Sequence, residues 1–136
     1  MGQSYFVVPF THERPWLTQA IRWVAGQSQP PVTVQAPKCV QATFYSQEKP
    51  RRIIVHLLNE INTTGNRALP ENNPPAREEI VPLAGIKVHF RQSEIKSLFQ
   101  EPGHVKLPMT RVGGGVETVV PKLDLHTMVV AELEDQ

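Results

Sequence analysis

After Pro31, apolar and polar residues alternate with a period of two in short runs, and turn residues such as Pro, Gly and Asn separate the runs. This alternation is typical of β-strands that bury one face, because successive side chains point to opposite sides of a sheet. The pattern predicts a mainly β fold, an antiparallel two-layer β-sandwich of about seven or eight strands. The expected strands are Val32–Pro37, Cys39–Tyr45, Arg52–Leu58, Ile86–Phe90, Glu94–Phe99, Val105–Leu107, Val116–Pro121 and Leu125–Leu133.

One run differs from the others, because Arg52–Leu58 is apolar on both faces. Such a strand is either buried on both sides or central in a sandwich. We therefore expect Val55, at its middle, to lie deep in the core. In Glu94–Phe99 two apolar neighbours at the end blur the period, and Gly113–Gly115 is expected to form a hairpin tip.

The N-terminal part of the chain follows a helical period instead. Apolar residues recur there at i, i+3/i+4 and i+7, which predicts one amphipathic helix from about Glu13 to Gly26. Gly26 suits the position after the last turn, and Thr11 is a candidate N-cap. A short strand is expected at Tyr5–Phe10. The chain is thus expected to have two parts, residues 1–30 with a strand and a helix, and residues 31–136 with the sandwich.

Composition narrows the classes of partner. The 136 residues contain 14 Lys and Arg against 13 Asp and Glu, so no basic field is available for nucleic acid or an anionic membrane. A single cysteine, Cys39, excludes an internal disulfide framework and is expected to be a buried, inert thiol. Neither a signal peptide nor a membrane-spanning apolar run is visible, so a cytoplasmic location is the default expectation.

No constellation for catalysis, a cofactor or a metal stands out. Glu78 and Glu79 are neighbours that would diverge if extended, which is unsuitable for the facing carboxylates of a glycosidase. The five histidines lack a recognised ligand spacing. Of these, His56 and His126 lie in strands that could meet across the sheet. We therefore predict no catalytic residue, no cofactor and no metal ligand.

The helix carries the most prominent aromatic pair. Trp16 and Trp23 are seven residues apart and, with Ala20, fall on one face. The favoured interpretation is that the two rings pack on the sandwich as a lid, because large aromatic side chains gain much from burial. The alternative is an interface with another domain or subunit, because an exposed apolar stripe marks a site of association.

Several of these segments resemble the C-terminal end of bacterial proteins related to family 42 β-galactosidases and α-fucosidase-like hydrolases. In that group a catalytic (β/α)8 barrel is followed by a flavodoxin-like trimerisation domain and then by a small antiparallel β-sandwich. The residues that carry the resemblance are Ala20–Trp23 with Pro31–Val32, Ala36–Pro37, the Arg-x-x-Val-His-Leu-x-Asn strand at Arg52–Asn59, Ile86–Val88, and the Val-Pro-x-Leu-x-x-His run within Val119–His126.

The resemblance extends from about Tyr5 to Leu133. It implies that residues 1–30 are the remnant of the trimerisation domain and that residues 31–136 are the closing sandwich. The catalytic carboxylates of such hydrolases sit on barrel strands, so no residue here inherits them. The resemblance also implies that the chain is a fragment, a truncated gene product or a single domain.

We therefore expect a non-catalytic accessory domain, not itself an enzyme, which packs on other domains of a parent hydrolase or self-associates through the helix. Two alternatives stay open. One is a carbohydrate-binding module, in which Phe44, Tyr45 and Phe99 are the candidate sugar contacts, because exposed aromatic rings on sandwich strands can stack on a sugar. The other is a small stand-alone enzyme.

Overall fold

A computed structural model describes residues 13–26, 30–61 and 80–134. The chain divides into two compact units, Met1–Pro30 and Pro31–Gln136. Three features predicted from the sequence lie outside the described residues: the strand at Tyr5–Phe10, the N-cap Thr11 and the acidic pair Glu78-Glu79.

The first unit contains the predicted helix, α2, which spans Glu13–Ala25. Gly26 ends it in the left-handed region at φ 59°, a conformation that glycine adopts without a steric penalty. The Gly26 N–H donates to the Trp23 carbonyl at 3.2 Å and so closes the last turn. The helix prediction is confirmed.

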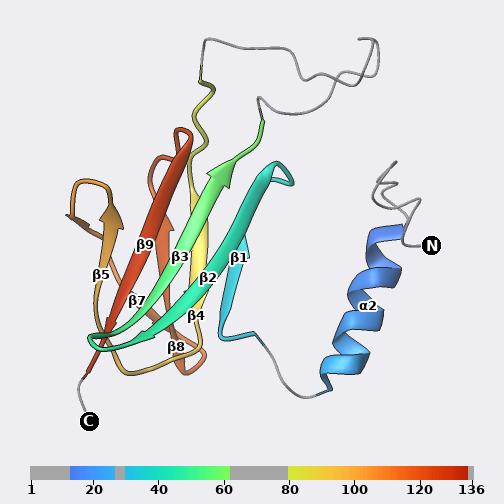
Figure 1. Cartoon of the computed structure of the whole chain (residues 1–136), viewed down its shortest axis with the longest axis horizontal. Helices are drawn as coiled ribbons and strands as arrows, with labels where there is room; N and C mark the ends of the chain where they lie inside the picture. The colour runs from blue at the N-terminus through green and yellow to red at the C-terminus, as the bar shows by residue number, and fades with distance from the viewer. Residues whose placement is uncertain (1–12, 27–29, 62–79, 135–136) are drawn as a thin grey trace. The chain divides into compact units, whose positions relative to one another are not determined.

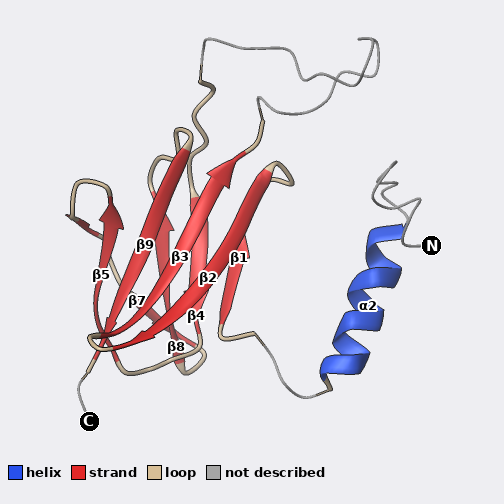
Figure 2. Ribbon diagram, in the orientation of Figure 1, coloured by secondary structure: helices blue, strands red, loops and turns tan. Residues whose placement is uncertain are grey.

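The second unit is a sandwich of two antiparallel sheets, which confirms the predicted fold class (Figures 1 and 2). One sheet has the strand order β1-β4-β8-β7 and the other β2-β3-β9-β5-β6. Figure 1 looks onto the five-stranded sheet, with the four-stranded sheet behind it. The strands are β1 (Val32–Gln35), β2 (Val40–Glu48), β3 (Arg51–Asn59), β4 (Ile86–Phe90), β5 (Ile95–Glu101), β6 (Val105–Lys106), β7 (Thr110–Val112), β8 (Gly115–Val120) and β9 (His126–Leu133).

The core lies between the two sheets and is built mainly from alternate residues of β3, β4, β8 and β9. In β4 the residues Ile86, Val88 and Phe90 are fully buried, and the residues between them face outward. The five-stranded sheet contributes the same alternation from β3 and β9, which includes Leu57, and β5 adds Leu98. Burying apolar area of this kind contributes about 25 cal/mol for each Å² removed from water. The period-two pattern in the sequence is therefore the pattern of the core.

Strand β3 is central in its sheet and covered on one face. Val55 is 1% exposed and Leu57 is fully buried, whereas Ile54 and His56 on the opposite face are only half-buried. Of the two interpretations of this strand, the central position is right. Burial on both sides is wrong, because burial alternates along β3, so that only one of its two faces lies in the core.

The blurred period in β5 has a structural cause. The register between β5 and β9 shifts between Ile95 and Ser97, so that one extra residue bulges out of the strand. The shift lets Ile95 and Leu98 both enter the core although they are three positions apart. It also turns Phe99 to the outer face.

Two further features of the strands differ from those predicted from the sequence, and the predicted hairpin tip is present. β2 runs three residues beyond the expected end, to Glu48, and the short exposed strand β7 was not predicted. The hairpin tip at Gly113 and Gly114 is confirmed, because both have positive φ, and Gly115 opens β8.

Candidate binding face on the five-stranded sheet

The outer face of the five-stranded sheet gathers the aromatic and ionisable side chains that could meet a partner. The strand register places Tyr45, Ile54, Val130 and Phe99 in one row across β2, β3, β9 and β5. With strands about 4.8 Å apart, the row spans about 14 Å. Its middle is aliphatic and its two ends are aromatic. We call this set and its flanking rows the outer face.

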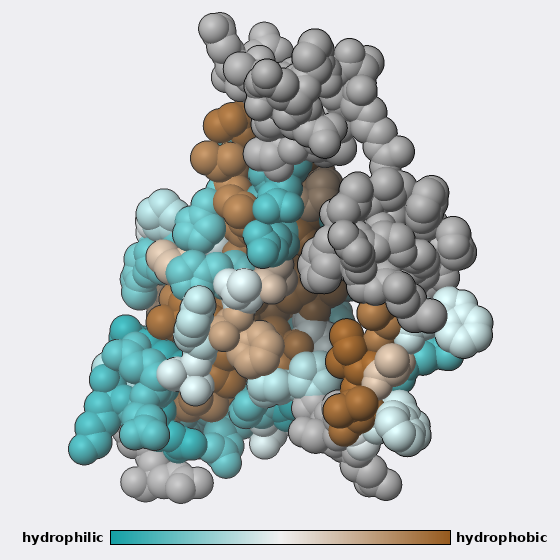
Figure 3. Space-filling view, turned by 45° about the vertical axis from the view of Figure 1, so that its right-hand side comes forward, coloured by the Kyte–Doolittle hydropathy of each residue, from teal (hydrophilic) through white to brown (hydrophobic). Residues whose placement is uncertain are grey.

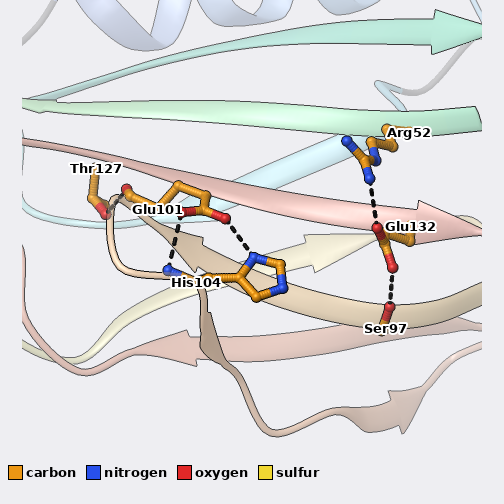
Figure 4. Close-up of polar contacts among 6 residues, drawn as sticks. All are labelled: Arg52, Ser97, Glu101, His104, Thr127 and Glu132. Carbon is orange, nitrogen blue, oxygen red and sulfur yellow. Dashed lines mark hydrogen bonds and ion pairs between the residues drawn. The ribbon is translucent and has the colours of Figure 1, made fainter. Parts of the chain in front are cut away.

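The neighbouring row on one side of the aliphatic middle consists of an ion pair, Arg52 with Glu132, and the hydroxyl of Ser97. Arg52 Nη2 lies 2.8 Å from Glu132 Oε1, and the Ser97 hydroxyl donates to Glu132 Oε2 at 2.7 Å (Figure 4). The hydrogen bond from Ser97, followed by that from Arg52, holds the pKa of Glu132 below its usual value of 4.5. Both oxygens of the carboxylate are engaged, so this row is ordered by its own contacts.

The row on the other side of the aliphatic middle ends in a tight turn that carries a carboxylate–histidine pair, Glu101 with His104. Glu101 accepts hydrogen bonds from the His104 ring at 2.7 Å and from the His104 backbone N–H at 3.0 Å (Figure 4). These contacts lower the pKa of Glu101, with the bond from the ring as the main cause. The His104 ring lies over Phe99, with centroids 4.1 Å apart and planes 12° apart. The Thr127 hydroxyl also donates a hydrogen bond to the Glu101 backbone carbonyl, at 2.8 Å.

His56 and His126 meet beside the aliphatic middle of the face, as expected from their positions in two strands of the sequence. His56 Nδ1 and His126 Nε2 are 3.1 Å apart, although the backbone partner of His126 is Leu58. The rings are 24° from coplanar with centroids 5.3 Å apart, which fits an edge-to-edge N–H···N hydrogen bond better than stacking. Tyr45 approaches His56 edge-on, at a centroid distance of 5.6 Å. Three polar rings therefore line this end of the outer face.

The three candidate sugar contacts do not share one face. Tyr45 is 62% exposed on the outer face, and Phe99 lies there half-buried under His104. Phe44 is 46% exposed on the opposite face of β2, opposite Val55 in the register. Adjacent residues of a strand point to opposite sides, so Phe44 and Tyr45 cannot form one platform.

The candidate interface residues Trp16, Ala20 and Trp23 are exposed on helix α2, with Trp16 at 68% and Trp23 at 84%. The lid and the interface, the two interpretations of this stripe, remain predictions. No helix among the described residues is long and apolar enough to span a membrane.

The carboxylates of the outer face are poorly placed for acid catalysis. Ser97 stands opposite Glu132, and Glu101 lies four residues further along β5, about 13 Å at 3.3 Å per residue. Glycosidases that act by two carboxylates hold them about 5–9.5 Å apart and raise the pKa of the acid. Here the pKa of each carboxyl is lowered. Within the described ranges no cluster of three or more His, Cys, Asp or Glu could hold a metal ion.

Ser97, Glu101 and Glu132 were not singled out from the sequence, whereas Arg52 entered only as part of the Arg52–Asn59 motif and His104 only as one of the five histidines. The position of Arg52 and Glu132 in alternating strands would have placed both on an outward face. Their pairing depends on which strands are neighbours, and β3 and β9 are far apart in the sequence. His104 depends in addition on a turn in which its own φ is 50°.

Comparison with known proteins gives a fold neighbour. No family model matches the chain, and a search of curated proteins finds no match. Among solved structures the chain is similar to α-L-fucosidase isoenzyme 2 from Paenibacillus thiaminolyticus, with a TM-score of 0.69 and 25% sequence identity. The similarity covers 88% of this chain and 17% of the fucosidase chain. The chain therefore corresponds to a small part of that glycoside hydrolase.

Proposed function

We propose that this chain is a non-catalytic accessory β-sandwich domain of a glycoside-hydrolase-like protein, and that it acts by packing on neighbouring domains or subunits. The observation that carries the proposal is the unequal coverage of the similarity, 88% of this chain against 17% of the fucosidase. The resemblance of the strands at Arg52–Asn59 and Val119–His126 to the closing sandwich of family 42 β-galactosidase-like proteins points to the same role.

The chemistry of the outer face supports a packing role. The carboxylates of its two flanking rows, Glu101 and Glu132, each have a partner, and their pKa values are lowered, the opposite of what a general acid requires. Its middle is half-buried and aliphatic, and its rims are charged. Interfaces between domains of one chain have this mixed character.

Two measurements test the proposal. The purified chain should leave aryl α-L-fucosides and aryl β-galactosides unhydrolysed, and the reading frame upstream of Met1 should encode a hydrolase barrel. Turnover of either glycoside that disappears in Glu101→Gln or Glu132→Gln, while Glu94→Gln retains it, would refute the non-catalytic role. The Glu94 variant is the matched control because Glu94 lies outside these rows and its carboxylate pairs with Arg51 at the longer distance of 3.4 Å.

A carbohydrate-binding module is the second candidate, and the exposure of Tyr45 favours it. A ring that is 62% exposed beside the His56–His126 pair could stack on a sugar and leave the imidazoles to bond its hydroxyls. Titration of the chain with oligosaccharides, followed by NMR, should then shift resonances of Tyr45 and His56. The matched variants are Tyr45→Ala, which should abolish the shifts, and Phe44→Ala, which should not. Silence across a glycan array would eliminate this candidate.

A further inference from the structure

Strand β2 is an unusual sheet edge. It is hydrogen-bonded to β3 on one side and has no neighbouring strand on the other among the described residues. The other edge strands, β1, β6 and β7, are four, two and three residues long, whereas β2 has nine. All of its residues from Gln41 to Glu48 are exposed.

Natural sheets protect long edges with short strands, lysine, proline or bulges, because unpaired backbone groups invite another strand. None of these devices occurs in β2. Its sequence, Val-Gln-Ala-Thr-Phe-Tyr-Ser-Gln-Glu, has neither lysine nor proline, and its register with β3 runs without a shift. Figure 3 turns this side of the sandwich toward the viewer and shows hydrophobic surface reaching the solvent between polar residues.

The register identifies the backbone groups that remain unpaired. Asn59 N–H donates to the Leu125 carbonyl, so Asn59 and alternate residues before it turn their backbone groups toward β9. The intervening residues of β3 turn theirs toward β2. It follows from the antiparallel alternation that Ala42, Phe44 and Ser46 direct their N–H and C=O groups away from the sheet. Each of these groups is available to a further strand.

The strand is complementary to itself. A two-fold axis at Phe44 would pair all nine residues of two antiparallel copies and bring the three unpaired residues of each copy opposite those of the other. Glu48 is the only residue of β2 that is charged at neutral pH. It would face Val40 of the other copy, so no like charges would meet. The pairs are Val40 with Glu48, Gln41 with Gln47, Ala42 with Ser46, Thr43 with Tyr45, and Phe44 with its counterpart.

We propose, building on the function proposed above, that the subunit on which this domain packs is a second copy of the same chain, and that the two β2 strands pair antiparallel about Phe44. The two five-stranded sheets become one continuous sheet of ten strands. The exposed Phe44 rings of the two copies lie side by side on the inner surface of that sheet. The assembly stops at two copies because the long edge is used up, and the far edge, β6, has only two residues.

The molar mass of the full chain in sedimentation equilibrium tests this pairing. The expected mass is twice the 15.3 kDa of one chain at the upper end of a dilution series. Ser46→Pro should give the monomer mass, because it removes an N–H that points away from β3 and leaves the pairing with β3 intact. Circular dichroism should show that this variant keeps the β spectrum of the wild type.

Two oppositely charged substitutions at one position test the same pairing without the use of proline. Phe44→Lys and Phe44→Glu should each be monomeric, because Phe44 faces its own counterpart and each variant places like charges together. An equimolar mixture of the two should recover the dimer mass. Tyr45→Lys is the matched control and should remain dimeric, because Tyr45 faces Thr43. Recovery in the mixture requires that residue 44 of one copy faces residue 44 of the other.

Each other outcome counts against the β2 pairing in a different way. A wild-type chain that is monomeric throughout the series overturns the pairing but leaves packing on other domains of a parent protein intact. A dimer that survives Ser46→Pro and both Phe44 variants, yet dissociates in Trp16→Ser or Trp23→Ser, places the interface on α2 and overturns the pairing through β2. Glycoside hydrolysis by the chain would instead refute the accessory function.

Discussion

Asn59, the last residue of β3, joins three segments of backbone through one buried side chain. Its amide donates to the carbonyls of Val81 and Asp124 at 2.9 and 2.8 Å, and its Oδ1 accepts the Ile61 N–H at 3.1 Å. The residue is only 3% exposed, so its polar atoms have little access to water. A single amide thereby ties the end of β3 to the segments that lead into β4 and β9.

Replacement of Asn59 by Ala should destabilise the sandwich markedly. Each polar group left buried without a partner costs about 1–3 kcal/mol, and the amide serves three backbone groups. We expect a loss of at least about 2 kcal/mol in the free energy of unfolding, measured by denaturant titration with an unchanged slope. Asn59→Asp should be no better, because its carboxylate faces two carbonyl oxygens. A midpoint equal to that of the wild type would show that these bonds contribute nothing.

The carboxyls of Glu101 and Glu132 make stability depend on pH at the acid end. Their pKa values are lower in the folded chain than the usual 4.5, so each contributes stability that is fully present above that value. The contribution is lost as the pH falls through the lowered pKa values. Both side chains are partly open to solvent, so the effect is modest and weakens with salt.

Thermal melts of Glu132→Gln against pH should show this linkage. At neutral pH the variant should melt below the wild type, because the Ser97 and Arg52 contacts lose a charged acceptor. The two melting temperatures should converge as the pH falls through the lowered pKa of Glu132, where the wild-type carboxyl also loses its charge. Glu94→Gln serves as the control and should show a smaller difference. A constant gap across the pH range would contradict the role of ionisation.

At the scale of elements, the alternation of β3 decides which substitutions the fold tolerates. Val55 is 1% exposed and faces the core, whereas its neighbour Ile54 faces outward and is half-buried. The two side chains belong to the same strand and have similar size and β-propensity, so a comparison between them isolates burial.

Val55→Asp should unfold the sandwich, and Ile54→Asp should leave it folded. An unpaired buried charge costs several kcal/mol, against a total stability of about 5–15 kcal/mol for a domain. Circular dichroism melts of the two variants provide the comparison. Equal melting curves for both would mean that β3 does not bury one face.

The bulge of β5 shows how an irregular strand departs from the period-two pattern expected from the sequence. Ile95 and Leu98 are an odd number of positions apart, yet both are buried, because the shift between Ile95 and Ser97 resets the alternation. A simple period-two reading would place one of them outside. The placement of Phe99 and of the Glu101–His104 turn on the outer face follows from this one irregularity.

At the scale of the whole molecule, the sandwich carries its own core. Every residue of the described core cluster lies between Val32 and Leu133, within the second compact unit. A unit with a contiguous core of this kind is expected to fold by itself.

A chain shortened to residues 31–136 should therefore fold and melt at a temperature close to that of the full chain. The expected infrared amide I band and far-ultraviolet circular dichroism spectrum are those of β structure, and the helical contribution to the circular dichroism should disappear. A shortened chain that gives the spectrum of an unfolded polypeptide would show that residues 1–30 are required for the sandwich.

The fold class, the helix from Glu13 to Ala25, the central place of β3 and the glycine hairpin tip could all be predicted from the sequence, because each depends on local periodicity or turn chemistry. The meeting of His56 and His126 was also foreseen, because both lie in recognisable strands. The pairs Arg52–Glu132 and Glu101–His104, the row that Tyr45 shares with Phe99, and the edge position of β2 were decided by the tertiary structure. The physical reason is that the order of strands in a sheet joins residues distant in the chain, whereas alternation along a strand only assigns each side chain to one face.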